Sequence, residues 1–406
     1  MVEPEQPHPA TDRRVFLRGA VAAGAGLALA PLAGCSDDGQ GGVEDGADSP
    51  IAEPVAEARE GAIAAGMGSA AAVGTQAVAA EGPELEWEMP TVWAATLPGD
   101  GAGFFAERVS ALTDGRFRIV PRSSGEVLGP FDVLPAVGEG TYPIGITLAY
   151  FHREQAPALA FSTTVPFGLS VRQALAWFHL GGGRELLRPL FARAFNVVQF
   201  PVGSKGAQMG GWFRREVVSL DGFKGLRMRI PGLGGAVLSR MGVETVTLPS
   251  GELAAALEDG SLDAAEFVGP ADDLSLGLHE AAPFYYFPGF WEPSAMNDLV
   301  VNTERWAELP ERYRQVLASA AAETATHVTA SYDLANADAL GELVRLGISI
   351  NRFPDDILSA GRAATAITLD ELAADDADFR QVYASWTDFR RLLAPWFGLA
   401  EAEILR

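Results

Sequence analysis

The strongest constraint on the fold is an alternation of short apolar runs with amphipathic stretches, which starts near Trp87 and continues to Asn302. Apolar runs bounded by turn residues are typical of strands, and apolar residues every three or four positions are typical of helices. Beyond Asn302 the spacing is helical almost throughout. This pattern predicts an α/β fold with a helical C-terminal region.

Individual elements can be assigned along this pattern. The strands are expected at 88–96, 116–120, 143–148, 197–201, 225–230, 245–247 and 264–268. The helices are expected at 103–113, 131–139, 171–194, 253–258, 306–340 and from 355 onward. No internal repeat accompanies them.

Residues 1–35 have the features of an export signal. The twin arginines Arg13 and Arg14 resemble a twin-arginine signal, and the apolar run over 19–33 is too short and too rich in Gly and Ala for a stable membrane span. The run ends in Leu-Ala-Gly-Cys at Cys35, which resembles a bacterial lipobox whose cysteine is acylated. The alternative is an ordinary secretory signal with an incidental cysteine. No later segment is apolar enough to predict a transmembrane helix.

A change in composition separates this signal from the folded domain. Residues 36–84 contain ten acidic residues, one basic residue and almost no aromatic ones. A segment of this kind cannot bury enough apolar surface to offset its chain entropy, so it is expected to be a disordered tether. The folded domain is then expected over 85–406.

The charge and the cysteine count exclude several classes of protein. The net charge is -23, from 53 acidic and 30 basic residues, which argues against nucleic acid or an anionic membrane surface as a partner. The chain has a single cysteine, Cys35, so a disulfide framework and a cysteine metal site are both excluded.

Signals for catalysis are weak. The five histidines are scattered without a zinc-binding spacing, and the chain has no G-x-S-x-G elbow. The stretch Gly232–Gly235 lacks a full dinucleotide-binding fingerprint. Two carboxylates, Glu266 and Glu292, leave open a hydrolase with an acid/base pair. A receptor that serves a signalling partner is a further alternative.

Three stretches are unusual for ordinary core packing, and a fourth, at 225–229, is considered with them. They are Gln-Met-Gly-Gly-Trp-Phe-Arg-Arg-Glu at 208–216, Gly-Leu-Arg-Met-Arg at 225–229, 262–273 and 283–292. Together they closely resemble the substrate-binding proteins of tripartite ATP-independent periplasmic (TRAP) transporters. The match is nearest to the branch that binds 2-oxoacids together with sodium, and it runs from about Trp87 to about Arg390.

The resemblance implies both a fold and a function. The fold would be a two-lobed α/β clamshell of the periplasmic binding protein kind (type II-like). Each lobe would be a mixed sheet flanked by helices, and the chain would cross between the lobes more than once. A small organic acid, such as a pyruvate-like 2-oxoacid, would bind in the cleft together with a cation. The protein would deliver it to a membrane permease without chemical change.

One arginine is expected to bind the carboxylate of the ligand. Arg229 ends an apolar strand, where a guanidinium can donate two parallel hydrogen bonds to a carboxylate. Arg227 falls on the same face, so alternation alone does not choose between them, and a surface salt bridge is the alternative for either. The resemblance implies Arg229.

Glu266 and Glu292 lie in apolar surroundings, where a buried carboxylate needs a partner. An anionic ligand beside both would leave excess negative charge, which a hard cation with oxygen ligands would reduce. The resemblance implies sodium, with calcium as the alternative, held by the side chains of Gln208 and Glu266 and the carbonyl of Phe267. Glu292 would reach the substrate or support the site. The family usually has tryptophan at the position of Phe267, and backbone amides are the alternative partners for the carboxylates.

The first lobe is expected to contribute residues at the end of the strand at 143–148. The predicted substrate contacts there are Thr147, Leu148, Ala149 and Tyr150. Aromatic side chains could either line the pocket or fill the core: Trp212, Tyr285, Tyr286 and Trp291.

The C-terminus bears on oligomeric state. The resembled branch carries a long final helix that reaches a second subunit and makes a swapped dimer. Here Pro395 and Gly398 are expected to break that helix, with Trp396 and Phe397 folding back onto the domain. The sequence therefore predicts a monomer.

Overall fold

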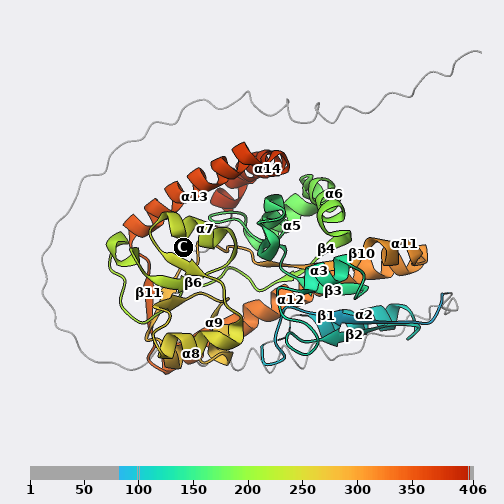
Figure 1. Cartoon of the computed structure of the whole chain (residues 1–406), viewed down its shortest axis with the longest axis horizontal. Helices are drawn as coiled ribbons and strands as arrows, with labels where there is room; N and C mark the ends of the chain where they lie inside the picture. Colours follow the sequence, from blue (N-terminus) through green and yellow to red (C-terminus); the bar gives the residue numbers. More distant parts are fainter. Residues whose placement is uncertain (1–81, 98, 100, 401, 403–406) are drawn as a thin grey trace, which may run out of the picture. The chain divides into compact units, whose positions relative to one another are not determined.

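The computed structural model describes residues 82–97, 99, 101–400 and 402. The predicted export signal, the lipobox cysteine Cys35 and the predicted tether up to residue 81 lie outside the described residues. Within the described part, the strands form two groups, each with its own core (Figure 1).

The first lobe is built on five strands. β1 (Leu85–Pro90) and β2 (Phe117–Arg122) pair in parallel, and β10 (Met296–Asn302) lies between β3 (Ile144–Thr147) and β4 (Val197–Ser204), antiparallel to both. A bridge from Thr91 to Ile146 links the β1–β2 pair to the sheet of β3, β10 and β4. Packed around them are α2 (Ala102–Leu112), α3 (Val133–Gly138), α4 (Ala160–Thr163), α5 (Val171–Leu180) and α6 (Gly183–Phe195).

The second lobe is a six-stranded mixed sheet in the order β11-β9-β5-β8-β6-β7. Its strands are β5 (Gly211–Phe213), β6 (Arg227–Arg229), β7 (Glu244–Val246), β8 (Ala264–Ala265), β9 (Phe284–Phe287) and β11 (Ser349–Arg352). The helices of this part of the chain are α7 (Gly232–Arg240), α8 (Leu253–Glu258), α9 (Pro270–Ser275), α10 (Leu278–Ala281) and α13 (Asp355–Asp375).

The chain passes between the two sheets three times. It leaves the first sheet after β4, returns at β10, and reaches the second sheet again at β11. Between β10 and β11 run α11 (Thr303–Glu308) and the long α12 (Glu311–Arg345), which packs against β4 at one end and α9 at the other (Figure 1). The predicted two-lobed α/β fold with a helical C-terminal region is confirmed.

Several predicted boundaries are wrong for local reasons. The strand expected at 88–96 is Leu85–Pro90, because its parallel register pairs Leu85 with Phe117 and ends at Arg122. The helix expected at 171–194 divides at Gly182, whose φ of 90° is outside the helical range. The strand expected at 264–268 is limited to Ala264–Ala265. The strands β5, β9, β10 and β11 were not predicted.

The predicted break at the C-terminus is also wrong. The last helix, α14 (Ala377–Ala400), continues through Pro395 and Gly398. Proline removes only the hydrogen bond to Arg391, and that turn is exposed, so water can satisfy the freed carbonyl. Phe397 lies under the guanidinium of Arg172, at 4.6 Å, but Trp396 is 63% exposed and does not fold back.

None of the helices in the described residues combines the length and the apolar character needed to cross a bilayer.

Candidate functional site

Arg229 occupies the end of β6, a strand flanked by β8 and β7. It is only 4% exposed, whereas Arg227 in the same strand is exposed. Its Nε donates to the carbonyl of Leu248 at 3.3 Å. Burial therefore distinguishes the two arginines that the strand pattern alone could not separate.

Glu266 follows β8 directly and lies next to Arg229. The Nη1 of Arg229 donates to Glu266 twice, to the backbone carbonyl at 2.6 Å and to the carboxylate Oε2 at 3.0 Å. The other carboxylate oxygen, Oε1, is buried and has no hydrogen-bond partner within the described residues. One oxygen of this carboxylate is thus available to a ligand or a cation.

Gln208 and Glu292 are brought together by two loops, one before β5 and one after β9. The backbone N–H of Gln208 donates to the carbonyl of Glu292, and that of Gly289 to the carbonyl of Gln208, each at 3.0 Å. The side-chain Nε2 of Gln208 donates to Glu292 Oε2 at 2.7 Å. The amide oxygen of Gln208 is buried without a partner in the described structure, like Glu266 Oε1.

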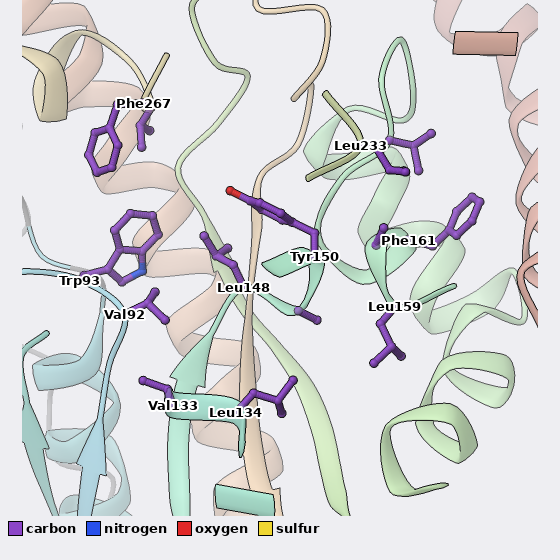
Figure 2. Packing of buried hydrophobic residues seen from close by; sticks show 14 of the residues in the cluster. Val92, Trp93, Val133, Leu134, Leu148, Tyr150, Leu159, Phe161, Leu233 and Phe267 are labelled. Atoms are coloured by element: carbon purple, nitrogen blue, oxygen red, sulfur yellow. The ribbon is translucent and has the colours of Figure 1, made fainter. Parts of the chain in front are cut away.

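Phe267 connects the site to the first lobe. Its ring lies 5.4 Å from the guanidinium carbon of Arg229 and meets Trp93 edge-on, with ring centroids 6.2 Å apart. Figure 2 shows Phe267 beside Trp93, which belongs to the loop after β1. The side chain of Phe267 is used in these contacts, and its backbone carbonyl could hold a cation.

The first lobe presents the predicted residues at the end of β3. Thr147 is fully buried and its hydroxyl has no partner within the described residues. Asp298 of β10 accepts from the backbone N–H of Ala149 at 3.3 Å. Leu148 is buried in the core, and the hydroxyl of Tyr150 is directed to the side that carries Phe267 and Trp93 (Figure 2). This hydroxyl bonds to the carboxylate of Glu292, so the two lobes meet there.

Glu266 and Glu292 both lie in surroundings that disfavour their ionised forms. Burial raises the pKa of Glu266 well above its ordinary value despite the opposing attraction of Arg229. Burial likewise raises the pKa of Glu292 to about 8, against the attraction of Arg229 and the hydrogen bond from Tyr150. One arginine does not compensate two buried carboxylates, so the site favours a proton or a bound cation.

A cavity of about 470 Å³ adjoins this site. The cavity is lined from the first lobe by Tyr150 and its neighbours Phe151 and His152. From the second lobe it is lined by residues 230–232. The volume is in the range of small-molecule sites, which lie preferentially between domains.

The four aromatic residues that could have lined the pocket are core residues, each at most 1% exposed: Trp212, Tyr285, Tyr286 and Trp291. Trp212 and Tyr285 stack with ring centroids 4.1 Å apart, and both donate to the buried carboxylate of Asp273, at 3.1 and 2.7 Å. These contacts pack Trp212 and Tyr285 into the sheet from which Glu266 follows.

Sequence reasoning missed the buried charges that support the site. Lys205 pairs with Asp272 at 3.0 Å and lies 3.4 Å from the ring centroid of Trp93. Asp298 accepts from Gln199 at 2.6 Å. An acidic residue within the apolar run 296–302 was the available signal for Asp298, since such a residue needs donors.

Within the described residues, no group of three or more His, Cys, Asp or Glu side chains could hold a metal ion. The predicted ligand set of one amide, one carboxylate and one carbonyl is of a different kind. Oxygen ligands of low total charge suit sodium or calcium better than a transition metal.

A buried guanidinium, two under-compensated carboxylates and a cavity between two lobes define a protein that encloses a small charged ligand. This is the arrangement of a solute-binding protein. The family model for bacterial extracellular solute-binding proteins, family 7, matches residues 91–376, and the chain belongs to that family.

Three relatives agree with this assignment. The monocarboxylate 2-oxoacid-binding periplasmic protein of Nostoc sp. is 44% identical over 323 residues, which cover 79% of this chain and 88% of the relative. A TRAP transporter solute-binding protein from Bordetella bronchiseptica, a dimer with calcium and picolinate, is 38% identical with a TM-score of 0.78, covering 79% of this chain and 96% of the other. One from Pseudoalteromonas atlantica, with sodium and pyruvate, is 32% identical with a TM-score of 0.77, covering 79% and 98%. The chain is a periplasmic solute-binding component of TRAP type.

Proposed function

We propose that this protein captures a pyruvate-like 2-oxoacid together with sodium or calcium and delivers it to a TRAP membrane permease. The observation that carries the proposal is the pair of buried oxygens without a partner within the described residues, Gln208 Oε1 and Glu266 Oε1. Gln208 also donates to Glu292, and Glu266 accepts from Arg229. Relatives that bind pyruvate or picolinate with these cations support it.

In this proposal each residue has a distinct role. Arg229 binds the ligand carboxylate, and Gln208, Glu266 and the Phe267 carbonyl bind the cation. Glu292 and Tyr150 hold the ligand from the two lobes, while Thr147, Leu148 and Ala149 shape the first-lobe wall. The cation compensates the second carboxylate, so that ligand and cation enter as a nearly neutral pair.

The protein is proposed to carry out no chemistry. A hydrolytic pair needs one carboxyl group free to transfer a proton to a substrate. Here Glu292 is bonded to Gln208 and Tyr150, and Glu266 to Arg229. The hydrolase alternative is therefore not favoured, and the family assignment favours a permease over a signalling partner.

The export route and the anchor are also proposals. We propose that residues 1–35 form a twin-arginine signal with a lipobox, that Cys35 carries the lipid anchor, and that 36–84 tether the domain 85–406 to the membrane. The monomer predicted from the sequence depended on the break at Pro395, which does not occur. We therefore do not propose a monomer.

Thermal unfolding with pyruvate in sodium chloride, and in choline chloride with a chelator, tests the function. A ligand at about 100 times its dissociation constant stabilises by about 2.7 kcal/mol. We expect this shift in sodium or calcium and its loss in choline. Gln208→Ala should reproduce the loss, whereas Gln315→Ala, an exposed glutamine of α12, should not. Equal shifts in sodium and choline would rule out the cation and favour a protonated glutamate.

A further inference from the structure

A second cavity, of about 680 Å³, lies between α5, α6 and α12, and its lining shares no residue with the site described above. Its walls are apolar, with Leu175, Phe178 and Trp306 facing small residues of α12. Arg184, Arg188 and Arg314 also line it, against a single carboxylate, Glu311. This cavity, called here the arginine groove, is thus cationic in a chain whose net charge is -23.

Arg188 is held in a fixed position in this groove. Its Nε donates to the carbonyl of Gln199 at 3.0 Å, and its guanidinium lies over the ring of Phe200, at 4.4 Å. Phe200 in turn packs on Trp306, with ring centroids 5.3 Å apart. No carboxylate of the described residues pairs with Arg188, so the edge that carries its two terminal nitrogens is available to an anion. A guanidinium fixed in this way loses little entropy when it binds a carboxylate.

The neighbouring charges add to the positive potential. Arg184 lies one turn earlier on the same helix and pairs at 3.1 Å with Glu185, which does not line the groove. Arg314 pairs with Glu311 at 2.9 Å, but its Nε is buried without a partner within the described residues. Burial, then Arg184, lowers the pKa of Arg188, and burial, then Arg184 and Arg188, lowers the pKa of His179. An anion in the groove would relieve this repulsion.

We propose that the arginine groove is a second binding site, separate from the cleft, for an organic carboxylate with an apolar body. The carboxylate binds the terminal nitrogens of Arg188, with Arg184 and Arg314 as further cationic neighbours. The apolar body covers the wall formed by Phe178 and Leu175. A bare inorganic anion would leave this wall in water, and a neutral ligand would leave the charges unbalanced.

Calorimetry on the full chain tests the chemical class, with pyruvate and sodium present at saturation to fill the cleft. The probes are benzoate, its neutral analogue benzamide, and acetate, which lacks the apolar body. We expect benzoate to bind and the other two to bind at least tenfold more weakly, or about 1.4 kcal/mol. Absence of benzoate binding at millimolar concentration, or equal binding of benzamide, would overturn the proposal.

Variants then locate the probe. Arg188→Gln should weaken benzoate binding at least tenfold and leave pyruvate binding unchanged. Arg193→Gln is the matched control, because Arg193 lies on the same helix but outside the groove, in an exposed pair with Asp378. If Arg188→Gln does not fold, as judged by circular dichroism, Arg184→Gln should weaken benzoate binding at least threefold.

Other results would place benzoate at another site or give the arginine groove another ligand. Loss of benzoate binding in Arg229→Lys but not in Arg188→Gln would place benzoate in the cleft and contradict the proposal. A hexaglutamate peptide that binds through Arg188 while benzoate does not would assign the groove to an acidic polypeptide. If pyruvate does not bind the native chain, the proposed function fails, and benzoate is titrated without pyruvate.

Discussion

Arg229 and Glu266 show how single residues set the chemistry of the cleft. A buried arginine is stabilised only if its charge is compensated and its donors are bonded. Here Nε and Nη1 are bonded to the protein, at Leu248 and Glu266. Nη2 has no bonded acceptor among the described residues. The guanidinium is thus oriented by the protein and retains a donor for a ligand.

Replacing Arg229 by lysine should weaken pyruvate binding at least tenfold, about 1.4 kcal/mol. A single ammonium group cannot keep the bonds to Leu248 and Glu266 and also donate to the ligand as Nη2 does. Calorimetry measures the change, and Arg227→Lys is the control, because Arg227 precedes it in the same strand but is exposed. Unchanged affinity in a folded Arg229→Lys protein would remove Arg229 from the site.

Glu292 predicts how stability depends on pH. Its pKa in the folded protein is about 8, against an ordinary value of 4.5, so between these pH values the folded state holds a proton that the unfolded state has lost. Stability is therefore greatest below about pH 4.5 as far as this group is concerned, and it falls as pH rises toward 8, by up to about 1.4 kcal/mol per pH unit.

Urea unfolding without ligand at pH 5, 6, 7 and 8 tests this slope. Glu292→Gln should reduce the slope by the contribution of about one proton. The contributions of Asp273 and Asp298, whose burial raises each pKa to about 7, should remain. Identical slopes in the native and variant proteins would show that Glu292 is ionised throughout.

At the scale of elements, α14 shows how a helix can tolerate residues that disfavour it. Pro395 and Gly398 fall in its exposed final turns, where lost backbone bonds can be replaced by water. The continued helix places three apolar side chains in solvent at helical spacing: Leu392, Trp396 and Leu399. Such a stripe favours association with another apolar surface.

We expect the chain to self-associate through this stripe, and Trp396→Glu to reduce the mass measured by light scattering to that of a monomer. A charge at the centre of an apolar contact is costly to bury. Val218→Glu, at an exposed apolar residue far from α14 in sequence, should have no effect. A monomeric native chain would restore the oligomeric state predicted from the sequence, although for a different reason.

At the scale of the whole molecule, the binding site depends on segments from both lobes. Tyr150 comes from the first lobe, and Glu292 follows β9 of the second. The chain passes between the sheets three times. A ligand that contacts both lobes can stabilise their closure. The fold explains capture of a solute, and the proposed retention at the membrane would depend on the N-terminal segment.

Cys35→Ser should release the protein from the membrane fraction into the soluble periplasm or medium, because it removes the thiol that would be acylated. Cell fractionation followed by immunoblotting measures this, with Ser36→Ala as the control. Replacing Arg13 and Arg14 by lysine should block export. A serine variant that stays in the membrane fraction would show that the lipobox resemblance is accidental.

The sequence by itself determined the fold class, most helices and the side chains of the candidate site. The helix at 253–258 was predicted with its observed bounds, and the motif residues Gln208, Arg229, Glu266 and Glu292 do lie together. Helical periodicity is local, and long polar motifs in apolar surroundings are rare without a function. Both kinds of information are therefore readable along the chain.

Only the tertiary structure decided which residues are buried and which strands pair. The short strands β5 and β8 exist because each has partners in a six-stranded sheet, not because of their own two or three residues. Burial separated Arg229 from Arg227 and assigned Trp212 and Tyr285 to the core. Solvent exposure allowed α14 to pass Pro395. Burial and pairing depend on neighbours that are distant in sequence, so no local pattern contains them.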